Sequence, residues 1–172
     1  MLLKNYQANQ SVPTLDFSGK NNTQCPTKAT SAKKHRTSTQ KKTIKILVVE
    51  DEPINQYVAK SLLEAQGYQV DIAATGKAAL NFYQTNQYAV VLMDMGLPDI
   101  KGTEVTRQIR ELEKSNGQHV PIIALTANGL SAKTECLAAG MDDFSKKPFK
   151  IEKLKKLLEF WIEKSKQLQR KS

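Results

Sequence analysis

The sequence predicts an α/β fold in which one doubly wound, parallel, five-stranded sheet is covered by helices on both faces. Several short runs rich in Val, Ile and Leu are nearly continuous, as in strands that are buried on both faces. Segments with apolar residues at helical spacing separate these runs, and such alternation is typical of parallel sheets. A chain of 172 residues has room for one such domain and an appendage.

The expected strands are recognised by their composition. The first, residues 44–50 (IKILVVE), is almost entirely apolar and rich in β-branched side chains. Residues 88–94 (YAVVLMD) and 120–127 (VPIIALTA) have the same character, whereas residues 69–73 (QVDIA) and 142–146 (DDFSK) are shorter and more polar. These five runs provide the strands of the predicted sheet.

The expected helices occupy the intervals. Pro53 suits the first position of a helix over residues 53–66, and Gly67 marks its end. Apolar residues recur at helical spacing in this segment, namely Ile54, Val58, Leu62 and Ala65. Further helices are expected at residues 77–84, 103–113, 131–139 and 151–166. The last carries an apolar stripe that is expected to be core, formed by Ile151, Leu154, Leu158 and Ile162.

The formal charge of +9 is concentrated in the first 42 residues, which contain eight Lys and Arg against one Asp. Residues 43–172 contain eighteen Lys and Arg against sixteen acids. The first segment is polar and lacks apolar periodicity, so we predict a disordered basic linker. Nucleic-acid or lipid contact through Lys33, Lys34, Arg36, Lys41 and Lys42 is the alternative. We favour a solvated linker without direct nucleic-acid contact, because no aromatic residue is interleaved with these charges.

The two cysteines, Cys25 and Cys136, form no metal-binding or redox motif. No apolar run approaches the length of a membrane span, and the polar N-terminal residues do not resemble a secretory signal. We therefore expect a chain without a membrane span in a reducing, cytoplasmic compartment, on the cytoplasmic side of the inner membrane if its parent is a membrane-bound sensor. Cys136 is expected to be a packing residue.

Chemically suited residues stand at the carboxyl ends of four expected strands, where ligands bind in open α/β sheets. These are Glu50 and Asp51, then Asp94, Thr126 and Lys147. Clustered carboxylates repel one another unless a cation lies among them, and oxygen ligands suit Mg²⁺. An ionised Asp94 beside Mg²⁺ and Lys147 could act as a nucleophile toward phosphorus. The Thr126 hydroxyl could then donate a hydrogen bond to a phosphoryl oxygen.

The motifs LVVEDE, VVLMDMGLPDIKG, IIALTA and DDFSKKPF, in this order, resemble the receiver domain of two-component response regulators, especially receivers of hybrid sensor histidine kinases. The resemblance covers residues 45–163 and implies a flavodoxin-like (βα)5 fold with strand order 2-1-3-4-5. The expected domains are the linker, residues 1–42, the receiver, residues 43–166, and a C-terminal tail, residues 167–172.

The resemblance also implies roles for individual residues. Asp94 corresponds to the phosphoacceptor in a two-component phosphorelay. Glu50, Asp51 and Asp94 correspond to the Mg²⁺ ligands, together with the backbone carbonyl of Gly96. The phosphoryl donor is then a phosphohistidine on a histidine kinase or a histidine phosphotransfer domain.

The phosphate-contacting and switch positions implied by the resemblance are Thr126, Ala127, Phe144 and Lys147. A cis peptide is expected between Lys147 and Pro148. The switch would act on the fourth helix, fifth strand and fifth helix, where we expect a partner surface and a phosphorylation-dependent homodimer. Glu50 replaces the usual first Asp of the family, so we expect it to reach the metal through water.

Other interpretations of the same residues were weighed. Glu50 and Asp51 could merely favour a helix N-terminus, Lys147 could be a surface lysine, and Thr126 could be a satisfied strand-end hydroxyl. His35 and His119 are expected to be solvated.

Three further functions are open: an aspartate-nucleophile phosphohydrolase, a degenerate receiver that only binds partners, and a DNA-binding regulator. The hydrolase is disfavoured, because that class needs a second Asp where this chain has Gly96. The receiver itself is not expected to be a stand-alone enzyme. It could be a stand-alone response regulator or part of a hybrid sensor, whose parent chain would be the histidine kinase.

Overall fold

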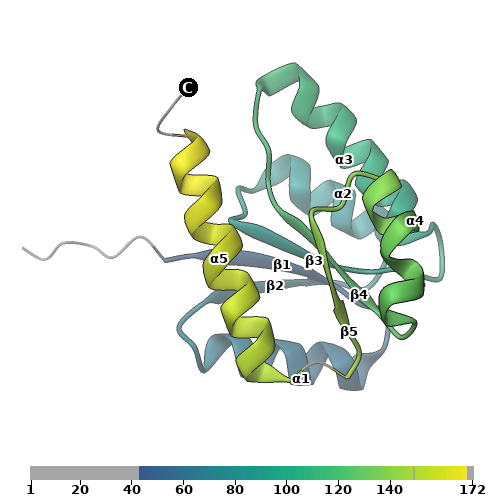
Figure 1. The fold of residues 1–172 in the computed structure, drawn as a ribbon, viewed down its shortest axis with the longest axis vertical. Helices are drawn as coiled ribbons and strands as arrows, with labels where there is room; N and C mark the ends of the chain where they lie inside the picture. The colour runs from purple at the N-terminus through teal and green to yellow at the C-terminus, as the bar shows by residue number, and fades with distance from the viewer. Residues whose placement is uncertain (1–42, 149, 170–172) are drawn as a thin grey trace, which may run out of the picture. The chain divides into compact units, whose positions relative to one another are not determined.

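Five parallel strands form one sheet in the order β2-β1-β3-β4-β5, with helices on both faces (Figure 1). The computed structural model describes residues 43–148 and 150–169. The strands are β1 (Lys45–Val49), β2 (Gln69–Ala73), β3 (Val90–Asp94), β4 (Ile122–Thr126) and β5 (Asp143–Lys146). The helices are α1 (Pro53–Glu64), α2 (Gly76–Thr85), α3 (Gly102–Asn116), α4 (Lys133–Ala138) and α5 (Ile151–Gln169). The predicted fold class, alternation and strand order are confirmed.

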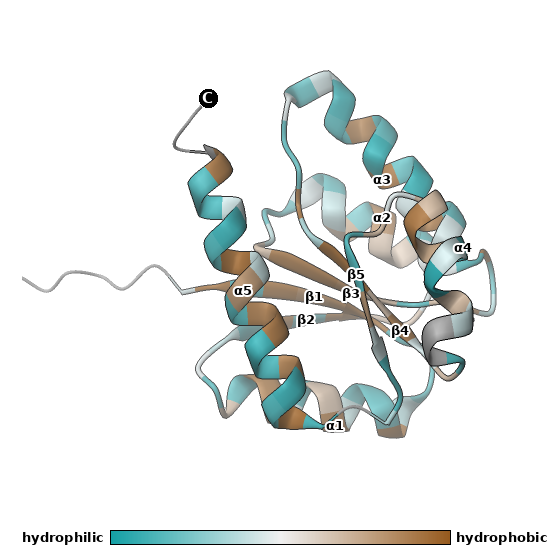
Figure 2. Ribbon diagram, viewed as in Figure 1, coloured by the Kyte–Doolittle hydropathy of each residue, from teal (hydrophilic) through white to brown (hydrophobic). Residues whose placement is uncertain are grey.

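The three central strands are buried on both faces, which explains their continuous apolar sequence. In β1, Leu47 and Val49 face a cluster shared with α2, α3 and α4, whereas Ile46 and Val48 face a cluster shared with α1 and α5. β3 divides its residues between the same two clusters. Figure 2 shows these central strands as a hydrophobic layer between helices that carry both hydrophilic and hydrophobic residues. The sheet is therefore the middle of a three-layer core.

The apolar residues of α1 do not all face the core. The residues of α1 that are fully buried are Ala59 and Leu63, whereas Ile54 is 71% exposed and Val58 is 42% exposed. Tyr57 is also exposed. Ala59 and Leu63 pack against the sheet, whereas the face of the helix that carries Ile54 and Val58 is turned toward solvent. The outer face of α1 consequently carries large apolar side chains.

Several element boundaries differ from the prediction for local reasons. α3 continues to Asn116 because the next residue, Gly117, adopts a left-handed conformation that ends the helix. The segment expected as one helix over residues 131–139 begins with a 3-10 turn, η1 (Gly129–Ala132), before α4. α5 extends to Gln169, three residues into the predicted tail, because no Gly or Pro interrupts it. The predicted linker at residues 1–42 lies outside the described residues, as do residues 170–172.

A buried ion-pair network joins α3 to the amino ends of β4 and β5. Arg110 binds Glu113 and, at 2.7 Å, Asp142, and it also donates to the Gly140 carbonyl at 2.8 Å. His119 was expected to be solvated, but its half-exposed ring lies 2.7 Å from Asp142. Burial opposes ionisation of Asp142, yet hydrogen bonds from His119 and the backbone, with the Arg110 charge, lower its pKa overall. The network fixes the loops that lead into the two strands.

Candidate functional site

The three predicted acidic residues meet at the carboxyl edge of the sheet. β1 ends at Val49, so Glu50 and Asp51 follow it directly, and the neighbouring strand β3 ends on Asp94. Glu50 is 2% exposed and Asp94 is 9% exposed, whereas Asp51 is exposed. One carboxylate oxygen from each residue can be chosen so that all three lie within 4.8 Å of one another. The parallel topology thus concentrates negative charge in a partly buried position.

Lys147 supplies the positive charge at this edge. Its ammonium nitrogen, Nζ, lies 2.7 Å from Asp94 Oδ2 and 2.5 Å from Glu50 Oε2. Burial opposes the charged ammonium, but the hydrogen bonds and charges of Asp94 and Glu50 outweigh it and raise the pKa of Lys147. The predicted cis peptide between Lys147 and Pro148 is present. Lys147 is therefore an inward-facing cation rather than a surface lysine.

Two amide side chains at the start of α1 hold the loop that carries Glu50. Asn55 Nδ2 donates to Glu50 Oε1 at 2.9 Å, and Gln56 Nε2 donates to the Glu50 backbone carbonyl at 2.7 Å. Both residues were missed by the sequence reasoning, although asparagine in the first turn of a helix, where it is a poor helix former, is a usable signal. With Lys147 on Oε2, both oxygens of the buried Glu50 carboxylate have donors.

The predicted switch residues lie on neighbouring strands. Thr126, at the end of β4, is 4% exposed, and its hydroxyl oxygen accepts a hydrogen bond from Asn128 N at 3.1 Å. The hydroxyl proton remains available for donation. Ala127 follows at an exposed position, whereas Phe144 is partly buried and packs against the cluster under α2, α3 and α4. Thr126 thus borders the carboxylate edge, and Phe144 lies one residue into β5 against the core.

The loop after β3 is held by contacts that the motif alone did not reveal. Gly96 N donates to Asp94 Oδ1 at 3.3 Å. Asp99 accepts hydrogen bonds from Gly76 N at 2.8 Å and Lys77 N at 2.9 Å, which lower its pKa and anchor the loop to the start of α2. At Gly102, an added Cβ would lie 2.0 Å from the Asp94 carbonyl oxygen, so only glycine fits there without a shift. The backbone of Asp94 therefore packs directly against the start of α3.

The donor set fits a small, hard divalent cation. Two oxygens bound to one Mg²⁺ at about 2.1 Å are separated by at most about 4.2 Å, so the three carboxylates need only a small adjustment or a bridging water. The exposure of Asp51 leaves room for the waters that Mg²⁺ retains. Glu50 already has a donor on each oxygen, which favours an outer, water-mediated role for it.

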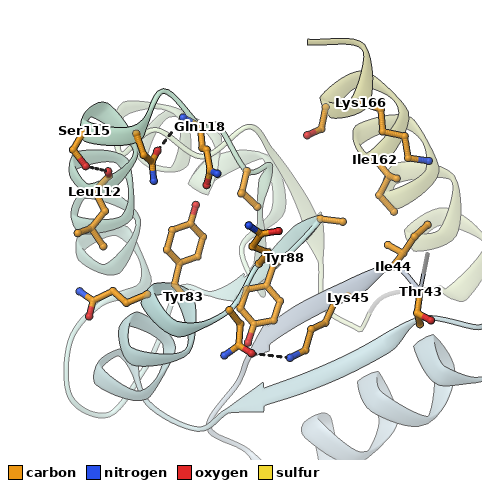
Figure 3. Close-up of a pocket in the computed structure, with 17 residues that line it drawn as sticks. Thr43, Ile44, Lys45, Tyr83, Tyr88, Leu112, Ser115, Gln118, Ile162 and Lys166 are labelled. Atoms are coloured by element: carbon orange, nitrogen blue, oxygen red, sulfur yellow. Dashed lines mark hydrogen bonds between the residues drawn. The ribbon is translucent and has the colours of Figure 1, made fainter. Parts of the chain in front are cut away.

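A cavity of about 800 Å³ lies at the opposite, amino edge of the sheet (Figure 3). Its wall includes Lys45, Tyr83 and Tyr88. These groups are already paired: Lys45 and Tyr88 bind Asp71, and Tyr83 donates to Glu113 at 2.6 Å. The cluster of three carboxylates and Lys147 lies instead at the carboxyl edge of the sheet, remote from this cavity.

Fold and site together define a class: a doubly wound α/β domain whose central strand ends on an aspartate, beside two further acids and an inward-facing lysine. The family model of the response regulator receiver domain matches residues 46–159. The chain belongs to this family, and it is a receiver domain of two-component phosphorelay signalling.

Several known proteins are similar to this chain. The aerobic respiration control sensor protein ArcB of Escherichia coli K12 is 41% identical over 119 residues, which cover 69% of this chain and 15% of ArcB. The receiver domain of the sensor histidine kinase PA1611 from Pseudomonas aeruginosa, solved with a magnesium ion in its active-site cleft, is 45% identical with a TM-score of 0.65. That match covers 70% of this chain and 98% of the other.

A third relative was solved with a partner. The receiver domain of Ssk1 from Saccharomyces cerevisiae, in complex with the histidine phosphotransfer protein Ypd1, is 32% identical with a TM-score of 0.66, covering 69% of this chain and 88% of the other. The matched part of the chain covers only about 6% to 16% of the length of these curated relatives, several of which are histidine kinases. Within the described residues, no helix is long and apolar enough to cross a membrane.

Proposed function

We propose that Asp94 is the phosphoacceptor of this receiver domain and takes its phosphoryl group from a phosphohistidine of a partner protein. One observation carries the proposal: a nearly buried carboxylate at the end of the central strand has Lys147 Nζ 2.7 Å from one oxygen and two other carboxylates beside it. A buried carboxylate in such company is costly unless cations neutralise the cluster. When cations balance the charge of the cluster, the Asp94 carboxylate can act as an oxygen nucleophile.

The residues that would hold Mg²⁺ are Asp51 and Asp94 directly, Glu50 through water, and the backbone carbonyl of Gly96. Magnesium in the cleft of the related PA1611 receiver supports this assignment. When bound, Mg²⁺ supplies positive charge beside the phosphoryl oxygens.

In the transfer, an Asp94 carboxylate oxygen forms the new bond to phosphorus while the bond from phosphorus to the imidazole nitrogen breaks. The electron pair of that bond remains on the imidazole. Lys147 pairs with the carboxylate beforehand and contacts the phosphoryl oxygens afterwards, because its ammonium group has three donors. Catalysis here is positioning and charge neutralisation.

The phosphoryl group is expected to draw the Thr126 hydroxyl and the Ala127 backbone toward it and to shift Phe144. The consequence is a change in the face formed by α4, β5 and α5, where we place the output surface and a phosphorylation-dependent homodimer. Phe144 has no hydroxyl, so its movement depends on packing alone.

The exposed apolar face of α1 is the surface we assign to the phosphodonor protein. Ile54, Tyr57 and Val58 are spaced at one helical turn and follow the Asp51 loop directly. Exposed clusters of large apolar residues mark interaction sites. The complex of Ypd1 with the Ssk1 receiver supports a phosphotransfer protein as the donor. Tyr57→Asp should slow transfer from a phosphotransfer protein about tenfold or more while leaving labelling by acetyl phosphate unchanged.

The decisive test is phosphorylation of the purified chain by acetyl phosphate in Mg²⁺, followed by intact-mass measurement. Wild type should gain one acid-labile phosphoryl group, and Asp94→Asn should gain none. Labelling of Asp94→Asn to the wild-type extent would overturn the assignment. Phosphotransfer profiling from histidine kinases and phosphotransfer proteins then identifies the donor.

The biological context we propose is a cytoplasmic receiver, belonging either to a hybrid sensor histidine kinase or to a stand-alone response regulator. The hybrid histidine kinases among the relatives support the first.

A further inference from the structure

Asn55 and Lys147 each contact a different oxygen of the buried Glu50 carboxylate. Glu50 Oε1 accepts from Asn55 Nδ2 at 2.9 Å, and Oε2 lies 2.5 Å from Lys147 Nζ. The same Nζ lies 2.7 Å from Asp94 Oδ2. We infer that Asn55 is a positioning residue, which keeps Glu50 on Lys147 through a single oxygen so that the lysine stays available to Asp94. This inference rests on the proposed function.

The burial of Glu50 makes the contact consequential. At 2% exposure, its carboxylate cannot turn an unpaired oxygen toward bulk water. Gln56 Nε2, the neighbouring amide, is already committed to the Glu50 backbone carbonyl at 2.7 Å. If Asn55 is removed, Lys147 is the cation within reach of the orphaned oxygen. A two-oxygen contact with Glu50 would then draw the ammonium group away from Asp94.

The fold places Asn55 for this task. It is the third residue of α1, and side chains in a helix lean toward its N-terminus, which is the direction of Glu50. Glu52 occupies the N-cap without a side-chain capping bond. The side-chain amides of Asn55 and Gln56 donate hydrogen bonds from α1 to Glu50, which follows β1 directly.

The expected signature is a loss of rate without a loss of Mg²⁺ binding. Asn55→Ala should lower the maximal rate of labelling by acetyl phosphate, at saturating Mg²⁺, about tenfold, the size expected for a lost hydrogen bond to a charged group. Calorimetric titration with Mg²⁺ alone should show affinity at least as tight as wild type, because withdrawal of the ammonium group from Asp94 leaves that carboxylate uncompensated near the cation position. A merely structural role would not separate these two quantities.

A double-mutant cycle tests whether Asn55 acts on the labelling rate through Glu50. Glu50→Gln replaces the carboxylate with a neutral amide, which cannot draw Lys147 in the same way. Adding Asn55→Ala to Glu50→Gln should therefore change the rate less than about twofold. Asn81→Ala, at an exposed position on α2, is the matched control and should keep the wild-type rate.

Each outcome is decisive. Wild-type labelling of Asn55→Ala, a loss that persists in full in the Glu50→Gln background, or Mg²⁺ binding weakened about tenfold would each overturn the positioning role. If Asn55→Ala does not fold, Asn55→Asp replaces it, since an acid in the first turn of a helix is favourable. Its maximal rate of labelling should be at least about tenfold below that of wild type, because its carboxylate competes for Lys147. Failure of wild type to be labelled would instead refute the proposed function.

Discussion

Replacing Gly102 with alanine tests how closely the start of α3 packs against Asp94. The added Cβ would lie 2.0 Å from the Asp94 carbonyl oxygen and 3.0 Å from Met93 Cγ. An ordinary carbon–oxygen contact is about 3.3 Å, so the two backbone segments must separate by about 1.3 Å. No rotamer change relieves this contact, because the obstructing atom belongs to the main chain.

The expected loss of stability is about 2 kcal/mol. Overpacking costs about 1–3 kcal/mol, and this main-chain clash lies at the upper end of that range, whereas alanine regains at most about 1 kcal/mol over glycine in a helix. For a domain of this size, that corresponds to a Tm lower by about 5–10 °C. Displacement of a reacting group by about 1 Å can cost up to about a hundredfold in rate, so labelling by acetyl phosphate should fall at least tenfold.

Thermal unfolding by circular dichroism and time courses of labelling measure both effects. Gly96→Ala is the stability control, because its Cβ would meet nothing within 4 Å, and it should stay within about 0.5 kcal/mol of wild type. A Gly102→Ala protein with wild-type Tm and rate would refute the proposed tight contact between α3 and the Asp94 backbone.

Three further predictions concern charge. Lys147→Met should lower the Tm in EDTA, because two carboxylates lose their shared cation, and added Mg²⁺ should raise its Tm more than that of wild type. The raised pKa of Lys147 means that its stabilisation is present below about pH 10.5 and is lost as the pH rises through the folded-state pKa. Between about pH 9 and 12, the free energy of unfolding measured in urea should therefore fall less for Lys147→Met than for wild type. Arg110→Met should cost about 3 kcal/mol in urea unfolding, because the buried Glu113 and the partly buried Asp142 lose the guanidinium that balances their charges. A loss below about 1 kcal/mol would contradict this reading of the network. Because the pKa of Asp142 is lowered, its ionised carboxylate stabilises the fold above about pH 3.8, and this stabilisation is lost as the pH falls through the folded-state pKa. The free energy of unfolding of Asp142→Asn should therefore fall less steeply than that of wild type in acid.

The order of strands and helices was predictable because it depends on local patterns. Continuous apolar runs such as residues 44–50 identify strands buried on both faces, and parallel strands place their carboxyl ends at one edge. The cluster could therefore be predicted from position alone. Asp94 ends one such run, and the other residues stand at other strand ends, namely Glu50, Asp51, Thr126 and Lys147.

The face of α1 that is buried could not be predicted in this way. Two stripes on the helix have apolar residues at helical spacing, one containing Ile54 and Val58 and the other containing Ala59 and Leu63. Periodicity supports burial of either stripe equally. Which stripe is buried depends on how closely the helix can approach the sheet. The structure buries the stripe with the smaller residue, and Ile54 and Val58 remain exposed.

By itself, the sequence determined the fold class, the strand ends and the chemical groups that gather at them, because these follow from local composition and the geometry of parallel sheets. Only the tertiary structure decided how those groups share their partners: Asn55 on Glu50, Lys147 between Glu50 and Asp94, and Gly102 against the Asp94 backbone. Such contacts depend on separations of a few tenths of an ångström between distant segments, which only the packing of the helices against the sheet sets.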